Sequence, residues 1–199
     1  MIRSPRSGIC VLLLITCMGI CGCVRRPKAI PVRIIEPQLL EPQLADPETQ
    51  VAKTPNAAAV RLLSAQARGH IGHPVLHQQP DGELTQDPVW RWSSRPDQYL
   101  DTALRLEAAR RPDLRLVDSG RVPELAATVL VWDLESTGGT QLVGAVEFQI
   151  TGTDGVINTK LVRASEQVSA ELPGDLAAAA GRLLRHLASE GFKSVASER

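Results

Sequence analysis

The sequence predicts an α+β domain with a mainly antiparallel sheet and two amphipathic helices packed on one face. Three observations support this class: segments of strong β character follow one another in the second half of the chain, tight-turn residues separate them, and two other segments carry apolar residues at helical spacing. Aromatic residues make up only 3% of the chain, so Leu, Val, Ile and Ala must supply the core. Such a set of elements favours helices that cover one face of the sheet.

Three long strands are expected at 125–135, 141–151 and about 156–170. The connections Ser136-Thr-Gly-Gly139 and Thr153-Asp-Gly155 are short and rich in turn residues. They predict an antiparallel meander. Apolar and polar residues alternate along the second strand, so one face of the sheet is expected to be buried and the other exposed to water.

Shorter strands are expected before the meander, at 57–63, 74–78, 84–92 and 114–117. The turn Pro80-Asp81-Gly82 separates the second and third of them and predicts a hairpin.

The first helix is expected to have Ser94 as its N-cap and Pro96 in its first turn, and to end before Pro112. The second helix covers 175–190, where leucines and alanines recur at helical spacing, and is expected to stop at Gly191 as a C-cap.

Residues 1–22 have the layout of a secretory signal, because Arg3 and Arg6 precede an apolar run that reaches Ile20. The run is short for a membrane-spanning helix, which needs about 20 apolar residues. It ends in Ile20-Cys21-Gly22-Cys23, which resembles the lipobox of bacterial lipoproteins: an aliphatic residue, two small residues and the cysteine that is acylated. We therefore predict that residues 1–22 are a lipoprotein signal peptide and that Cys23 is the lipidation site.

Cleavage before Cys23 would remove the other three cysteines, so the mature protein would form no disulfide. A zinc or redox site at Cys21 and Cys23 is disfavoured, because two cysteines do not complete a zinc ligand set. Loss of Arg3 and Arg6 would lower the 22 basic residues to 20, against 22 acidic residues. This balance argues against nucleic-acid binding, which needs a concentrated basic surface.

Residues 23–56 are expected to form the lipidated cysteine and a proline-rich tether. Six prolines occur between Val24 and Asn56, and the sequence EPQL is present at 36–39 and again at 41–44. Spaced prolines favour extended chain and a semi-rigid linker. A short docking segment, or an edge strand at 30–35, remains an alternative. Residues 57–199 are expected to form a single domain.

The sequence contains no recognisable catalytic constellation, so we predict no enzyme activity and no cofactor. Neither a Gly-x-Ser-x-Gly elbow nor a Ser-x-x-Lys sequence of the penicillin-recognising kind is present. His70, His73 and His77 would share one face of a helix, but neighbouring glycines disfavour a helix there, and we predict no metal site. Asp133 and Glu135 share one side of a strand and are interpreted as surface charges.

The triplet Trp90-Arg91-Trp92 contains two of the three tryptophans of the chain. By strand alternation both rings should point to the same side. Trp92 is expected to pack in the core, whereas Trp90 is either a core residue or an exposed binding residue. Trp90, Arg91 and Trp92 are therefore candidates for interaction or core packing.

The stretch His73–Leu104 resembles the ABC-type transport auxiliary lipoprotein family (PqiC-like). The shared pattern is a strand, a short acidic turn, a strand ending in Arg-Trp, a proline, and a helix carrying Leu and Ala-Leu. Here it is met by Asp81-Gly82-Glu83, Arg91-Trp92, Pro96, Leu100 and Ala103-Leu104. The later sequence VLVWDLES and the alanine-rich last helix also fit in order.

The resemblance implies a non-enzymatic, membrane-anchored component of an ABC/MCE-type envelope transport system that moves lipids between the inner and outer membranes. Its expected partners are an MCE-type substrate-binding protein and an ABC permease/ATPase complex, and relatives that self-associate imply a homo-oligomer as a further possibility. Val24 stands where an inner-membrane retention signal would place Asp, so we expect the periplasmic face of the outer membrane. The alternatives are an accessory lipoprotein of an outer-membrane assembly machine or a peptidoglycan synthase, and a hydrolase with an unrecognised site.

Overall fold

The computed structural model describes residues 30–39, 54–136, 139–169 and 173–196. The chain divides into two units, Met1–Pro31 and Val32–Arg199. Only two residues of the first unit are described, and both are exposed. All helices and strands of the described residues belong to the second unit. The predicted signal peptide and Cys23 lie outside the described residues.

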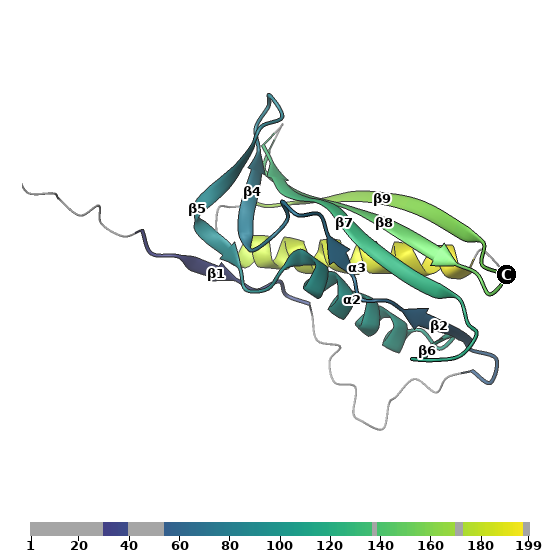
Figure 1. The fold of residues 1–199 in the computed structure, drawn as a ribbon. Coiled ribbons are helices and arrows are strands. Elements are labelled where there is room, and N and C mark those ends of the chain that lie inside the picture. Colours follow the sequence, from purple (N-terminus) through teal and green to yellow (C-terminus); the bar gives the residue numbers. More distant parts are fainter. Residues whose placement is uncertain (1–29, 40–53, 137–138, 170–172, 197–199) are drawn as a thin grey trace, which may run out of the picture. The chain divides into compact units, whose positions relative to one another are not determined.

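The three longest strands of the described part form the predicted meander. They are β7 (Glu124–Glu135), β8 (Gln141–Thr151) and β9 (Ile157–Gln167). β8 is antiparallel to β7 along one edge and to β9 along the other, so the three strands run side by side along the sheet (Figure 1). The prediction of an antiparallel meander is confirmed, with strand ends within three residues of those expected.

Shorter strands complete the nine-stranded sheet of the described residues. They are β1 (Arg33–Ile35), β2 (Ala58–Leu62), β3 (Gln66–Ala67), β4 (Pro74–Gln78), β5 (Leu84–Trp92) and β6 (Leu114–Leu116). β4 and β5 pair as the predicted hairpin, with a register shift between Pro74 and Leu76. β7 pairs with β8 along one edge. Along its other edge it pairs in turn with β2, β3 and β4, and all three are parallel to it.

The α+β class is confirmed, but the sheet is mixed rather than mainly antiparallel. The chain leaves the β4–β5 hairpin, passes through helix α2 (Pro96–Arg110) and returns as β7 beside β4. β7 is parallel to β4 and therefore runs opposite to β5, the strand that leads into α2. β1 with β5, and β2 with β6, are parallel as well.

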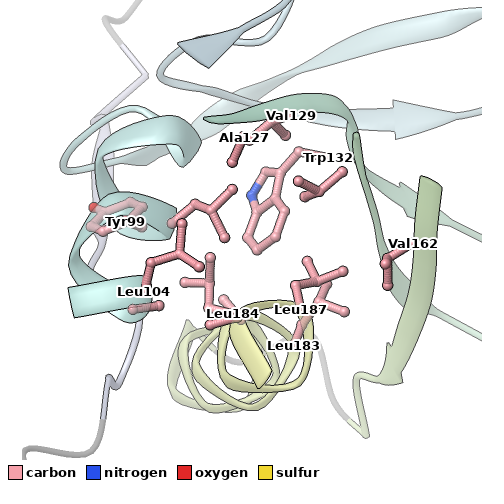
Figure 2. Close-up of a cluster of buried hydrophobic side chains, with 14 of the residues drawn as sticks. Tyr99, Leu104, Ala127, Val129, Trp132, Val162, Leu183, Leu184 and Leu187 are labelled. Atoms are coloured by element: carbon pink, nitrogen blue, oxygen red, sulfur yellow. The ribbon is translucent and has the colours of Figure 1, made fainter. Parts of the chain in front are cut away.

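Helix α2 and the long helix α3 (Pro173–Ala196) cover one face of the sheet (Figure 1). The core lies between them and the sheet, where Trp132 of β7 packs above Leu183 and Leu187 of α3 (Figure 2). Gly144 of β8 allows this approach, because a Cβ atom there would lie 3.1 to 3.3 Å from these three side chains. A larger residue at position 144 would push α3 away from the sheet.

The N-cap of α2 is Arg95, so the prediction of Ser94 is wrong. Pro96 occupies the first helical position, which places the cap on the residue directly before it. The backbone N–H of Arg95 donates to Oε1 of Gln98 at 3.2 Å, and that of Ser94 donates to the hydroxyl of Tyr99 at 2.7 Å.

Helix α3 continues past Gly191, so the prediction of a C-cap there is wrong. An added Cβ atom at Gly191 would lie 2.7 Å from Cε1 of Phe148, which is fully buried in the sheet. Phe192 and Val195 are buried beyond it. The glycine therefore serves close packing of the helix on the sheet, and apolar burial extends the helix.

Part of the segment predicted as a tether belongs to the folded unit. The edge strand left open at 30–35 forms over Arg33–Ile35 and pairs with β5. After β1 the chain crosses α3, where the backbone N–H of Gln38 donates to the carbonyl of Ala177 at 3.0 Å. Ile35 and Pro37 are buried. We refer to Val32–Leu39 as the N-terminal strap.

Candidate functional site

Trp90 and Trp92 lie on the same side of strand β5, but they are buried to different extents. Trp92 is only 1% exposed and packs edge to face on Trp132, with ring centroids 5.9 Å apart and planes inclined by 62°. Such aromatic pairs stabilise a core beyond simple burial. The indole nitrogens of both rings are buried without a hydrogen-bond partner among the described residues. Trp92 is therefore a packing residue of the core.

Trp90 is partly buried and lies under the strap. The guanidinium carbon of Arg33 is 5.2 Å from the centre of its ring, and the register of β1 on β5 places these two residues side by side. This cation–π contact contributes about 0.5–1 kcal/mol at a partly exposed site. Trp90 thus connects the strap to the hairpin.

Arg91 is engaged by the backbone of its own strand. Its Nη1 donates to the carbonyl of Trp90 at 2.8 Å and also to the carbonyl of Asp87. These donors are therefore occupied in holding the irregular part of β5.

Asp87 and His77 form a polar pair across the β4–β5 hairpin. Nε2 of His77 lies 2.9 Å from Oδ2 of Asp87. Oδ1 of Asp87 accepts the backbone N–H groups of Val89 and Trp90, both at 2.7 Å. Burial acts to raise the pKa of Asp87, but these backbone hydrogen bonds and the His77 contact outweigh it and hold the pKa below the ordinary value.

A cavity of about 290 Å³ opens beside this pair, between the β4–β5 hairpin, the strap and the start of α3. Its lining residues are Ile35, Val75, His77, Asp87, Trp90, Leu134, Ser136, Thr140, Val168, Pro173 and Leu176. The walls combine apolar and polar surface, with the His77–Asp87 pair as the ionisable part. Its volume is close to the lower end of the range for small-ligand pockets, and it also suits one apolar side chain of a partner.

The three histidines of the 70–77 stretch are not brought together as a ligand set. Nδ1 of His73 lies 3.2 Å from the carbonyl of Trp92, whereas His77 contacts Asp87 and His70 is exposed. In the part of the chain that the structure describes, no group of three His, Cys, Asp or Glu side chains is arranged to hold a metal ion.

Asp133 is a buried acid that the sequence pattern did not reveal. Its interpretation as a surface charge is wrong, because the residue is 6% exposed and its Oδ1 has no hydrogen-bond partner among the described residues. Burial and, to a lesser degree, the nearby Glu135 carboxylate raise the pKa of Asp133 to about 6, against the opposing charges of Arg163 and His70. Strand alternation assigns a residue to a face, but it does not show what covers that face.

None of the helices formed by the described residues combines the length and the apolar character needed to cross a membrane.

No family model matches the chain, and no curated protein matches its sequence significantly. Similarity is found among solved structures. A crystal structure of an uncharacterized protein aligns with a TM-score of 0.60 at 13% identity, over 72% of this chain and 95% of the other. Protein XCC0632 from Xanthomonas campestris, assigned to the family DUF330, aligns with a TM-score of 0.57 at 16% identity, over 82% and 90% of the two chains.

The hypothetical protein CT253 from Chlamydia trachomatis aligns with a TM-score of 0.50 at 9% identity, over 70% of this chain and 95% of the other. At such low identities these alignments show a shared fold. The chain is thus similar in fold to XCC0632 and to the two other proteins over most of their lengths.

Proposed function

We propose that this protein is a non-enzymatic lipoprotein, anchored through Cys23, that serves as an auxiliary component of an ABC/MCE-type envelope transport system. The observation that carries the proposal is the combination of a lipobox at 20–23 with a domain whose fold is similar to that of the DUF330 protein XCC0632. The sequence resemblance of 73–104 to the auxiliary lipoproteins points in the same direction.

The polar groups beside the cavity support a binding role rather than a catalytic one. Asp87 uses Oδ1 to hold the backbone of Val89 and Trp90, and His77 contacts Oδ2 of the same carboxylate. A carboxylate with three such hydrogen bonds is fixed in place and shapes the wall of the cavity. In this proposal an apolar side chain of the MCE-type partner enters the cavity, and lipids move through the partner complex.

In this proposal the lipid anchor lies in the inner leaflet of the outer membrane, and the domain lies in the periplasm. Sedimentation of native envelopes on a density gradient tests this placement. We expect the mature protein with outer-membrane markers, and its recovery with inner-membrane markers would overturn this part of the proposal.

The experiment that tests the function is capture of the full-length lipoprotein from its native envelope in mild detergent, with identification of the proteins retained. A Cys23→Ala variant, which cannot be acylated, is the control for anchoring. Leu134→Asp, which puts a charge on the apolar wall of the cavity, is compared with Leu161→Asp on the exposed strand β9.

We expect an MCE-type protein and an ABC permease to be retained by the unmodified chain and by Leu161→Asp, and to be lost from Leu134→Asp. Circular dichroism must first show that Leu134→Asp is folded; if it is not, Trp90→Ala replaces it. Retention of a peptidoglycan synthase or of an outer-membrane assembly factor instead would overturn the transport proposal and favour an assembly role.

A further inference from the structure

The N-terminal strap exposes two large apolar side chains, one just before strand β1 and one within it. Val32 is 57% exposed and Ile34 is 60% exposed, although both belong to the folded unit. They share one side of the strap, opposite to Ile35, which is buried in the core. Their exposure therefore costs free energy in water unless another surface covers them.

The charges on the side of these two apolar residues are balanced. The register of β1 on β5 places Arg91 beside Ile34, whereas Arg33 lies on the opposite side of the strap, over Trp90. Glu36 carries a negative charge on the side of Ile34, and its carboxylate accepts the hydroxyl of Ser93. A small exposed apolar surface without an excess of negative charge suits the interfacial region of a membrane.

Chain length brings this surface close to the predicted anchor. Val32 follows Cys23 by nine residues, so the two Cα atoms can be separated by no more than about 30 Å even in a fully extended chain. The strap is held in the domain by its pairing with β5 and by the bond from Gln38 to Ala177. The anchor therefore keeps Val32 and Ile34 at a high effective concentration near the lipid surface.

The edge of β1 is poorly suited to pairing with a strand of another protein. β1 has only three residues, and prolines at positions 31 and 37 limit its extension in both directions. Proline next to an edge strand protects it from pairing with another chain. The side chains of Val32 and Ile34, rather than the strand edge, are the feature that needs a partner.

We propose that Val32 and Ile34 insert into the lipid headgroup region of the membrane that carries the anchor. The inference rests on the proposed lipidation of Cys23. Insertion of these two side chains would orient the domain on the membrane surface. The cavity beside Trp90 would then have a fixed orientation relative to the membrane.

The test uses the mature lipidated protein with one added thiol. Val32→Cys and Ile34→Cys are compared with Leu161→Cys, which is on β9 and whose native side chain is 63% exposed. Because Cys10, Cys17 and Cys21 would leave with the signal peptide and the Cys23 sulfur would be alkylated, the added thiol is the one site for an environment-sensitive fluorophore. The labelled proteins are reconstituted in vesicles of phosphatidylethanolamine and phosphatidylglycerol.

We expect labels at 32 and 34 to be quenched by spin-labelled lipids and shielded from iodide, and the label at 161 to show the reverse. Iodide quenching at 32 and 34 as strong as at 161 would overturn the inference. Shielding from iodide without quenching by lipids would also overturn it and would indicate a second copy of the chain as the partner. Intact mass and flotation with vesicles report the anchor separately, so a protein without lipid would refute the anchoring proposal itself.

Discussion

The backbone N–H of Gln38 donates a hydrogen bond to the carbonyl of Ala177, 3.0 Å away, and so fastens the N-terminal strap across helix α3. Gly181 lies one turn further along the helix. A Cβ atom at this position would collide with the carbonyl of Gln38, so the absence of a side chain is required for the strap to lie there.

We expect Gly181→Ala to lower the free energy of unfolding by about 1–3 kcal/mol, because the strap must shift to relieve the collision. Urea denaturation measures this loss, and faster hydrogen exchange of the Gln38 amide would locate it. Gly174→Ala in the same helix is the matched control, since an added Cβ atom there has no neighbour within 4 Å. Equal stability of the two variants would contradict the role of Gly181.

Trp92 and Trp90 should differ sharply when each is truncated. Trp92→Ala removes a fully buried ring that packs on Trp132, so we expect a loss of about 3–5 kcal/mol. Trp90→Ala removes a partly buried ring and its contact with Arg33, with an expected loss of about 1 kcal/mol. Urea midpoints compare the two variants, and near-ultraviolet circular dichroism should lose the signal of the coupled rings only in Trp92→Ala. Similar losses would mean that Trp90 is a core residue too.

Asp87 should stabilise the irregular part of β5 through hydrogen bonds rather than through its charge alone. Asp87→Ala leaves the N–H groups of Val89 and Trp90 without their acceptor, and we expect a loss of about 1–3 kcal/mol at pH 7. Asp87→Asn keeps an oxygen acceptor and should lose less. Because the folded state lowers the pKa of Asp87, its stabilisation is complete above the unfolded pKa of 3.8 and is lost as pH falls through the folded value.

Urea denaturation at pH 7 and at pH 3 tests this expectation. The difference between wild type and Asp87→Ala should be smaller at pH 3, whereas Asp118→Ala, at an exposed site, should match wild type at both values. A loss in Asp87→Asn as large as in Asp87→Ala would show that the charge, and not the oxygen acceptor, is what matters.

Local signals made most of the fold predictable. The β-rich segments and the turns at 136–139 and 153–155 predicted the meander, because neighbouring strands joined by tight turns pair with each other. The parallel pairing of β4 with β7 was not predictable in the same way, because β5, α2 and β6 lie between the two strands in the sequence. Gly191 was misinterpreted for a related reason: its contact, Phe148, is distant in the sequence.

The candidate site was only partly predictable. Alternation along β5 and its apolar neighbours were sufficient to expect Trp92 in the core. The pairing of His77 with Asp87 depends on the register of a hairpin that contains an irregularity, which the sequence does not specify. The strap could not be predicted because its proline-rich sequence has the composition of a linker. The glycine against which it packs, Gly181, lies more than 140 residues later in the sequence.

The buried carboxyl of Asp133 should make the stability of the protein depend on pH. Val143, its partner on β8, is also buried, so the carboxyl lies in a poorly hydrated part of the sheet. The pKa of Asp133 is about 6 in the folded state, against 3.8 for the ordinary group. Between these two values the folded state binds more protons than the unfolded state, so stability must fall as pH rises from about 4 to about 6.

We expect Asp133→Asn to abolish this pH dependence, because the amide does not ionise. The free energy of unfolding of the variant minus that of wild type is measured in urea at two pH values. This difference should be about 1–3 kcal/mol larger at pH 7.5 than at pH 4. Asp118→Asn is the control for removal of an exposed carboxylate and should leave the pH profile of wild type unchanged. A profile of Asp133→Asn parallel to that of wild type would show that the carboxyl is hydrated in the folded protein and carries no desolvation penalty.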